Sequence, residues 1–296
     1  MNTQSRAALE GAFWMVLAGA AFAGVNTLEQ IATTQAGLPA PTAAFLQYLV
    51  AFLVVIPWAI RRGIGAMKTR RPGLHALRVV LSALGVQAWV AALAHAVPIG
   101  TAIALVMTSP FFVTLGAGIF LKETITPERW LAVTVGFVGG MIILDPFSGG
   151  WSAIYLLPVA AAAFWAAASL CQKRLLMEES PSTSTAWLLL LLAPINLVLA
   201  VPTGLLPTSS FQLWTIAAVG VLTALAQGLL SLAYAKADAA YVQPFDHVKL
   251  PLNILAGWIV FGTIPPGRLW IGAALIAGAS LFLLLREHRA ARAAPV

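Results

Sequence analysis

The densest group of residues able to do chemistry lies between positions 243 and 253, inside an otherwise apolar stretch. It contains two amides, an imidazole and two opposite charges: Gln243, Asp246, His247, Lys249 and Asn253. At about 100° per residue, Asp246, Lys249 and Asn253 share one face of a helix. An ionisable side chain at the centre of a bilayer costs roughly 2.5–3.5 kcal/mol on insertion scales, so such a stripe indicates a functional site.

Two interpretations of the charged residues follow from their spacing. In the first, Lys249 holds a carboxylate of a bound molecule, while Asp246 faces an ammonium group or carries a proton. In the second, the two residues lie three apart on a helix and neutralise each other as an internal ion pair. His247 lies on a neighbouring face, and an unperturbed imidazole titrates near neutral pH. Asp246 and His247 are therefore the candidates for proton coupling, with helix packing as the alternative role of His247.

Polar and aromatic residues of other apolar stretches extend the candidate binding site. The additional residues are Asn26, Trp165, Gln227 and Tyr241. Pro110 and Pro251 lie inside predicted helices, where proline removes a backbone hydrogen bond and clashes with the preceding turn. They are candidate hinges, or else packed kinks. Cys171 is the single cysteine, and no metal-ligand spacing is visible, so we expect neither a metal nor a cofactor.

Composition defines the class of protein. Hydrophobic residues make up 60% of the 296 residues and charged residues only 9%, against about 25% charged in a typical soluble domain. This chain has too little charge to cover a soluble fold. The net charge is +7, but nucleic-acid binding needs a basic face on a soluble domain, which this chain lacks. We therefore expect no nucleic-acid partner. The composition predicts an all-α polytopic membrane protein with membrane lipid around it.

Ten stretches are apolar and long enough to span a bilayer, which needs about 20 residues. They cover residues 9–28, 41–60, 73–95, 98–121, 127–145, 152–172, 184–203, 211–233, 239–261 and 267–285. With a cytoplasmic N-terminus, every Lys and Arg except Arg268 and Lys249 falls on or near the inner side. The pattern predicts ten transmembrane helices with both termini cytoplasmic. No connection can hold a nucleotide-binding domain, and no Walker-type phosphate loop is present.

The chain contains an internal repeat. Leu93-Ala94-His95-Ala96, Pro110 and Thr124-Ile125-Thr126-Pro127 recur in order as Leu232-Ala233-Tyr234-Ala235, Pro251 and Thr263-Ile264-Pro265-Pro266. Each half then holds five spans, and an odd number inverts the second half in the membrane. We therefore expect two inverted five-helix repeats, residues 1–146 and 147–296, the second ending in a short basic cytoplasmic tail. Inverted repeats are typical of alternating-access transporters with a site near the midplane.

These motifs resemble those of a known family. Ala91-Ala92-Leu93-Ala94-His95-Ala96-Val97-Pro98, Ser109-Pro110 and Leu121-Lys122-Glu123-Thr124 are similar to the signature of EamA-type transporters of the drug/metabolite transporter superfamily. Length and span layout resemble the bacterial YddG-type amino-acid exporters. The sequence departs from the family pattern at two positions: Ala23 stands where the family usually has Trp, and Gly262 replaces the Glu of the second repeat. For Glu123, at the inner surface, we expect a loop salt bridge. The resemblance implies a bacterial inner-membrane location.

The residues and the resemblance together favour a secondary active exporter rather than an enzyme. A cavity with one cation, one anion, amides and aromatic rings suits small amphiphilic metabolites, above all hydrophobic or aromatic amino acids. The alternative is a multidrug or cationic-compound exporter, with proton coupling as one option, although Lys249 disfavours cationic substrates. We expect a small-molecule substrate as the partner and a monomeric chain.

Overall fold

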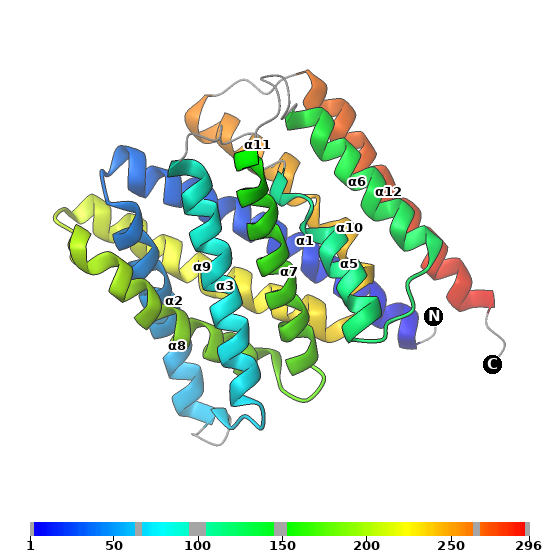
Figure 1. Ribbon diagram of the computed structural model, residues 1–296, viewed down its shortest axis with the longest axis horizontal. Coiled ribbons are helices and arrows are strands. Elements are labelled where there is room, and N and C mark those ends of the chain that lie inside the picture. The colour runs from blue at the N-terminus through cyan, green and yellow to red at the C-terminus, as the bar shows by residue number, and fades with distance from the viewer. Residues whose placement is uncertain (1–2, 63–66, 95–104, 145–152, 263–266, 294–296) are drawn as a thin grey trace.

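The computed structural model describes the chain except residues 1–2, 63–66, 95–104, 145–152, 263–266 and 294–296. Every regular element in the described part is a helix (Figure 1). The α-helices are α1 (Thr3–Gln30), α2 (Ala40–Arg62), α3 (Pro72–Ala94), α5 (Ser109–Phe120), α6 (Pro127–Leu144), α7 (Leu156–Leu175), α8 (Pro181–Ala200), α9 (Ser210–Lys236), α10 (Ala239–Asp246), α11 (Lys249–Phe261) and α12 (Arg268–Ala293). A π-helical segment, η1 (Ile31–Gln35), continues α1, and short 3-10 turns lie at Ala153–Tyr155 and Val201–Thr203.

Local sequence signals set several helix ends. Ser180 precedes α8, and its hydroxyl accepts a hydrogen bond from Thr183 N at 3.1 Å, with Pro181 in the first turn. Ser209 caps α9 in the same way through Gln212 N at 3.2 Å. Serine N-caps and early prolines are strong helix-start signals. Within a bilayer the helix satisfies its own backbone donors and acceptors, which explains why an apolar chain adopts it throughout.

Within the described residues, five stretches are long and apolar enough to cross a membrane: Arg6–Gln35, Ala40–Pro57, Ala153–Leu175, Pro181–Thr203 and Ser210–Lys236. Large apolar side chains also lie on the outside of the molecule. Phe120 is 74% exposed, Trp214 74% and Ile259 79%. A soluble protein would expose these groups to water at a large cost, whereas lipid chains cover them in a bilayer. The all-helical membrane architecture expected from composition is thus confirmed.

Helices distant in sequence lie side by side. α1 packs along α9, α3 along α7, α2 along α8 and α9, and α6 along α12, the last pair forming one flank of the molecule (Figure 1). Small residues permit the close approaches. A Cβ atom at Gly11 would lie 2.5 Å from Ala237 Cβ, and one at Gly220 would lie 2.4 Å from Val50 Cβ. Small residues at helix interfaces are typical of membrane helix packing.

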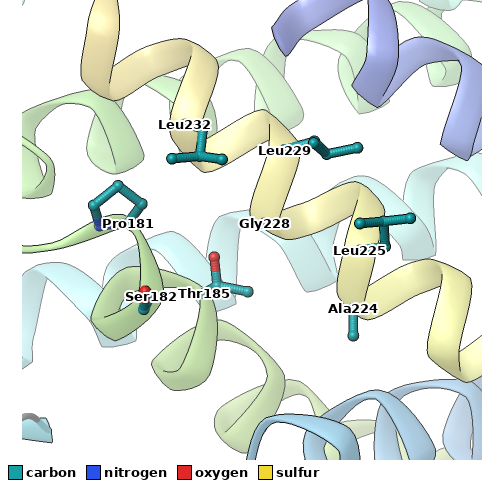
Figure 2. Close-up of a pocket in the computed structure, with 8 residues that line it drawn as sticks. All are labelled: Pro181, Ser182, Thr185, Ala224, Leu225, Gly228, Leu229 and Leu232. Atoms are coloured by element: carbon teal, nitrogen blue, oxygen red, sulfur yellow. The ribbon is translucent and has the colours of Figure 1, made fainter. Parts of the chain in front are cut away.

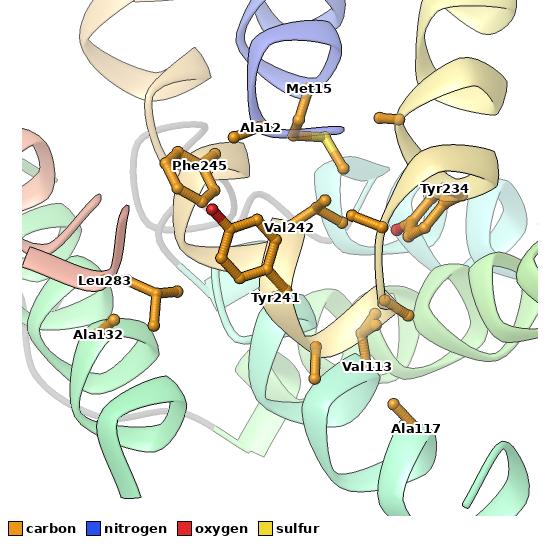
Figure 3. Packing of buried hydrophobic residues seen from close by; sticks show 14 of the residues in the cluster. Ala12, Met15, Val113, Ala117, Ala132, Tyr234, Tyr241, Val242, Phe245 and Leu283 are labelled. Atoms are coloured by element: carbon orange, nitrogen blue, oxygen red, sulfur yellow. The ribbon is translucent and has the colours of Figure 1, made fainter. Parts of the chain in front are cut away.

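The largest apolar cluster joins α1, α5, α6, α7, α9, α10 and α12 (Figure 3). Met15, Tyr234, Tyr241, Phe245 and Leu283 are among its buried members. This cluster surrounds α10 and fixes its position between helices from both parts of the chain.

The ninth predicted span is not one continuous helix. Residues 239–261 divide into α10 and α11, with a turn at His247 and Val248. The fourth predicted span is described only from Leu105 onwards, since residues 95–104, including His95 of the repeat motif, lie outside the described part. The proposed boundary between the halves at residues 146 and 147 also lies outside it.

Candidate functional site

The break between α10 and α11 has a direct cause in the sequence. Pro251 lacks the N–H that would donate to the His247 carbonyl. Leu250 N donates to that carbonyl instead, at 3.1 Å, and Val248 N donates to Phe245 O at 3.2 Å. These tighter bonds turn the chain before the helix resumes at Lys249.

A similar turn precedes Pro110 in the first part of the chain. Thr108 N donates to Leu105 O at 3.1 Å, and Phe111 N donates to Thr108 O at 3.0 Å. α5 then begins at Ser109, with Pro110 buried in its first turn. Both candidate hinge prolines therefore lie in the first turn of a helix that follows a break, where discontinuous helices expose backbone groups for binding in other transporters.

The charged residues of the ninth span form an ion pair. Lys249 Nζ lies 2.6 Å from Asp246 Oδ2, and the pair bridges the break between α10 and α11. The two side chains are 28% and 21% exposed. A pair with this much open surface is reachable by a ligand, although each charge already has its partner. The ion pair of the second interpretation is observed, and substrate binding by Lys249 and Asp246 stays a prediction.

An amide pair lies next to the ion pair and joins the first helix to the ninth span. Asn26 Nδ2 donates to Asn253 Oδ1 at 2.9 Å, and Asn253 Nδ2 donates to Lys249 O at 2.7 Å. Asn26 is exposed. Gly19 of α1 also faces Lys249, because a Cβ there would lie 3.3 Å from Lys249 Cβ. The structure thus brings Asn26, Asp246, Lys249 and Asn253 together at the α1–α11 contact.

Two other expected residues, Gln243 and Tyr241, lie on α10 and are buried. Gln243 is buried and donates to Tyr234 OH at 3.1 Å and to Ala239 O at 3.3 Å. Tyr241 is 2% exposed, and the Arg129 guanidinium lies 5.8 Å from its ring centre. The Tyr241 ring packs in the apolar cluster around α10 (Figure 3).

Trp165 and Gln227 lie on other helices. Trp165 Nε1 donates to Ser82 O of α3 at 3.3 Å, and its ring lies against Gly85 and 6.3 Å from the Trp89 ring. Gln227 is half-buried, and its backbone carbonyl accepts from Thr185 Oγ1 at 3.5 Å. Trp165 therefore belongs to the α3–α7 contact, away from the α1–α11 contact.

His247 is fully buried at the break. Its ring fills the space left by Gly136 of α6, where a Cβ would lie 2.5 Å from His247 Cδ2. The close fit agrees with a packing role for His247, whereas neither ring nitrogen has a hydrogen-bond partner among the described residues. Proton coupling through His247 stays a prediction.

The sequence assigned a different role to Glu123 and overlooked Glu29. Glu123 accepts hydrogen bonds from Ala239 N at 2.9 Å and Ala240 N at 3.0 Å, so its carboxylate caps the N-terminus of α10. The expected loop salt bridge of Glu123 is therefore replaced by a helix cap, because the loop after α5 folds back onto α10. Glu29 of α1 lies one turn beyond Asn26, and its position at the end of a predicted span concealed it.

The pocket drawn in Figure 2 lies between α8 and α9 and has a volume of about 250 Å³. It is lined by Pro181, Ser182, Thr185, Ala224, Gly228 and Leu232 among others. It contains no ionisable side chain and none of the residues expected at the binding site. Among the described residues, no three His, Cys, Asp or Glu side chains lie close enough to hold a metal ion.

Comparison with known proteins identifies the family. The model of the EamA-like transporter family matches twice, at residues 9–145 and 152–285. The chain is 54% identical over 285 residues to a riboflavin transporter of Rhizobium johnstonii, covering 96% of this chain and 94% of the relative. A riboflavin transporter of Vibrio cholerae is 49% identical over 285 residues, with 96% of each chain covered.

More distant matches include another transporter and a solved structure. An S-adenosylmethionine uptake transporter of Rickettsia conorii is 27% identical, covering 98% of this chain and 97% of the relative. A crystal structure with 19% identity superposes with a TM-score of 0.75, covering 96% of this chain and 98% of that one, and shows the shared fold. The chain is a multi-pass membrane protein and a transporter rather than an enzyme, and it belongs to the EamA-like transporter family.

Proposed function

We propose that the protein is a secondary active transporter of riboflavin or a closely related flavin. The observation that carries the proposal is the near full-length similarity to two riboflavin transporters, at 54% and 49% identity. The substrate expected from the sequence was an amino acid, and neither these relatives nor the S-adenosylmethionine transporters support it. The Lys249–Asp246 pair keeps a zwitterionic amino acid as the second candidate, because its two charges match a carboxylate and an ammonium group.

The helix pairing supports two inverted five-helix halves, residues 1–146 and 147–296. The first helix of the first half, α1, packs on α9, the third full span of the second half. Reciprocally, α7 begins the second half and packs on α3, the third span of the first. Exchange of the two halves thus leaves the pattern unchanged, as a pseudo-two-fold axis requires. The equivalent breaks before Pro110 and Pro251 add to this support.

The polar group at the α1–α11 contact suits a neutral, acceptor-rich ligand. The isoalloxazine ring of riboflavin carries two carbonyl oxygens, which need donors. Lys249, Asn26 and Asn253 supply ammonium and amide donors there, and an incoming ligand competes with the Asn26–Asn253 bond. We place the ring edge at these residues, with Asp246 holding Lys249. In this proposal Gln243 and Tyr241 support α10 from behind, and Trp165 and Gln227 stay predicted substrate contacts outside the α1–α11 contact.

Reconstitution tests the substrate. Purified protein in liposomes preloaded with unlabelled riboflavin should take up external labelled riboflavin by exchange, and excess riboflavin should abolish the signal. Excess phenylalanine or S-adenosylmethionine should compete at least tenfold less well. Exchange of phenylalanine but not riboflavin would contradict the proposal. Accumulation of riboflavin under an imposed riboflavin or proton gradient would then give the direction and the coupling of transport. The direction tests the predicted export, and the coupling tests the predicted proton sites at Asp246 and His247.

Cysteine labelling tests the ten-span topology. In a Cys171→Ala background, cysteines at Gly65 and Ser209 should react with impermeant reagents from opposite sides of the membrane. The basic loop around Gly65 is expected inside and the uncharged loop around Ser209 outside. Labelling of both from one side would contradict the inverted arrangement and the cytoplasmic termini.

A further inference from the structure

Glu29 is a carboxylate within the helical bundle that has no cationic partner. Among the described residues, no Lys, Arg or His forms an ion pair or hydrogen bond with its side chain. Every other acidic side chain named here is satisfied: Asp246 by Lys249, Glu10 by Lys236, and Glu123 by the α10 backbone. A half-buried carboxylate without such a partner is costly in a membrane protein.

The position of Glu29 places it beside the polar group at the α1–α11 contact. It follows Asn26 by three residues on α1, so the two side chains lie on the same helix face about one turn apart. Asn26 is exposed and reaches Asn253 of α11.

The backbone around Glu29 is also unusual. α1 changes to the π-helical segment η1 at Ile31, two residues after Glu29. Thr33 Oγ1 donates to Glu29 O at 3.0 Å, and Thr34 Oγ1 donates to Gln30 O at 2.6 Å. π-helical turns occur mostly where a helix is adapted to a functional site.

The chemistry of a carboxylate restricts what it can bind. An ionised carboxylate only accepts hydrogen bonds, so it repels the carbonyl edge of an isoalloxazine ring. The ribityl chain of riboflavin carries four hydroxyl groups, all of which can donate. Asn26, Asn253 and Lys249 offer donors, whereas Glu29, one turn away, offers acceptors. Along this contact the protein thus offers donors first and acceptors one turn later. A flavin offers the complementary groups in the same order, with acceptors on its ring and donors on its ribityl chain.

We infer that Glu29 is a specificity residue that accepts hydrogen bonds from the ribityl hydroxyls of the substrate. The inference rests on the proposed riboflavin transport and assigns the sugar-alcohol end of the site. In this role Glu29 makes the transporter selective for flavins that carry a polyol side chain over flavins that lack it.

A pair of fluorescent ligands tests the inference. Lumiflavin keeps the isoalloxazine ring but carries a methyl group in place of the ribityl chain. Binding of riboflavin and lumiflavin to purified protein is measured by fluorescence quenching. Glu29→Gln should weaken riboflavin binding about tenfold, as expected for hydrogen bonds to a charged group, and change lumiflavin binding less than twofold. The ratio of the two affinities does not depend on the fraction of protein that is folded.

Matched variants separate the possible outcomes. Glu10→Gln removes a carboxylate from the same helix at its far end, where it pairs with Lys236 at 2.8 Å, and should leave the ratio unchanged. Glu29→Asp keeps the charge on a shorter side chain and should shift the ratio in the same direction as Glu29→Gln, by a smaller factor. This variant provides the test if Glu29→Gln does not fold. Equal weakening of both ligands, or none, would overturn the inference. Failure of the parent protein to bind either flavin would instead contradict the proposed function.

Discussion

The two ends of α10 are held in opposite ways. Its N-terminus at Ala239 is fixed by the Glu123 carboxylate, while Arg129 of α6 binds Asp238 at 3.1 Å and Lys173 of α7 donates to the Tyr234 carbonyl at 2.8 Å. Its C-terminus at Asp246 ends in a turn, with one ion pair that remains partly exposed.

The difference separates structural charges from candidate binding charges. At the N-terminus, side chains from several helices satisfy buried backbone groups and one another. The anions and cations there also match the helix dipoles of α10 and α9. At the C-terminus, open surface and a broken backbone leave capacity for binding. We therefore expect changes at the first end to reduce stability and changes at the second to reduce transport.

The largest effect is expected at the fixed end. Glu123→Ala removes both acceptors from Ala239 N and Ala240 N and leaves two buried donors without partners. Hydrogen bonds to charged groups contribute about 1.5–3 kcal/mol each, so the free energy of unfolding should fall by about 3 kcal/mol. Denaturant unfolding in detergent measures it, with Glu123→Gln as a control that retains one acceptor oxygen and loses about half as much. Full stability of the alanine variant would remove the distinction between the two ends.

The second effect concerns transport at the open end. Lys249→Met keeps the length of the side chain and removes its charge, so riboflavin exchange should fall at least about tenfold in a protein that remains folded. Size-exclusion profiles check folding. If Lys249 serves only to neutralise Asp246, the double variant with Asp246→Leu should recover full activity. Such recovery would show that the ion pair is structural, like the charges at the other end.

A smaller effect is expected from the break itself. Pro251→Ala supplies the missing N–H, so α10 and α11 can join into a continuous helix. Turnover should fall severalfold while the affinity for riboflavin changes less than about tenfold, a shift below about 1.4 kcal/mol. Pro110→Ala is the matched variant at the equivalent break. Parent-like turnover in both variants would identify these prolines as packing kinks.

The smallest effect is expected from a charge pair outside the bundle. Arg71 Nη2 lies 2.7 Å from Glu178 Oε1, and this hydrogen bond lowers the pKa of the Glu178 carboxyl below its usual value. A lowered pKa contributes stability above the unfolded value, and this contribution is lost as the pH falls through the folded pKa. Because both groups are exposed to solvent, Glu178→Gln should leave stability at pH 7 almost unchanged and only slightly flatten its acid dependence. A large loss at pH 7 would mean that surface pairs matter as much as the fixed end of α10.

The sequence alone determined the class of protein and the positions of its polar groups. A composition with so little charge admits only a membrane protein, and helices follow because lipid cannot satisfy backbone donors. The ordered motifs gave the family, and the three-residue spacing of Asp246 and Lys249 allowed their pairing as one of two interpretations. Pro251 marked the region of the break, although its effect on the helix was underestimated, since a continuous span was expected.

Only the tertiary structure decided which polar residues meet. Asn26 and Asn253 are 227 residues apart in sequence, and no local pattern relates them. Glu123 caps α10 because the loop after α5 folds against a helix from the other end of the chain, and Trp165 joins the α3–α7 contact for the same kind of reason. Local periodicity fixes which face of a helix a residue occupies, whereas the partner of that face depends on how all the helices pack together.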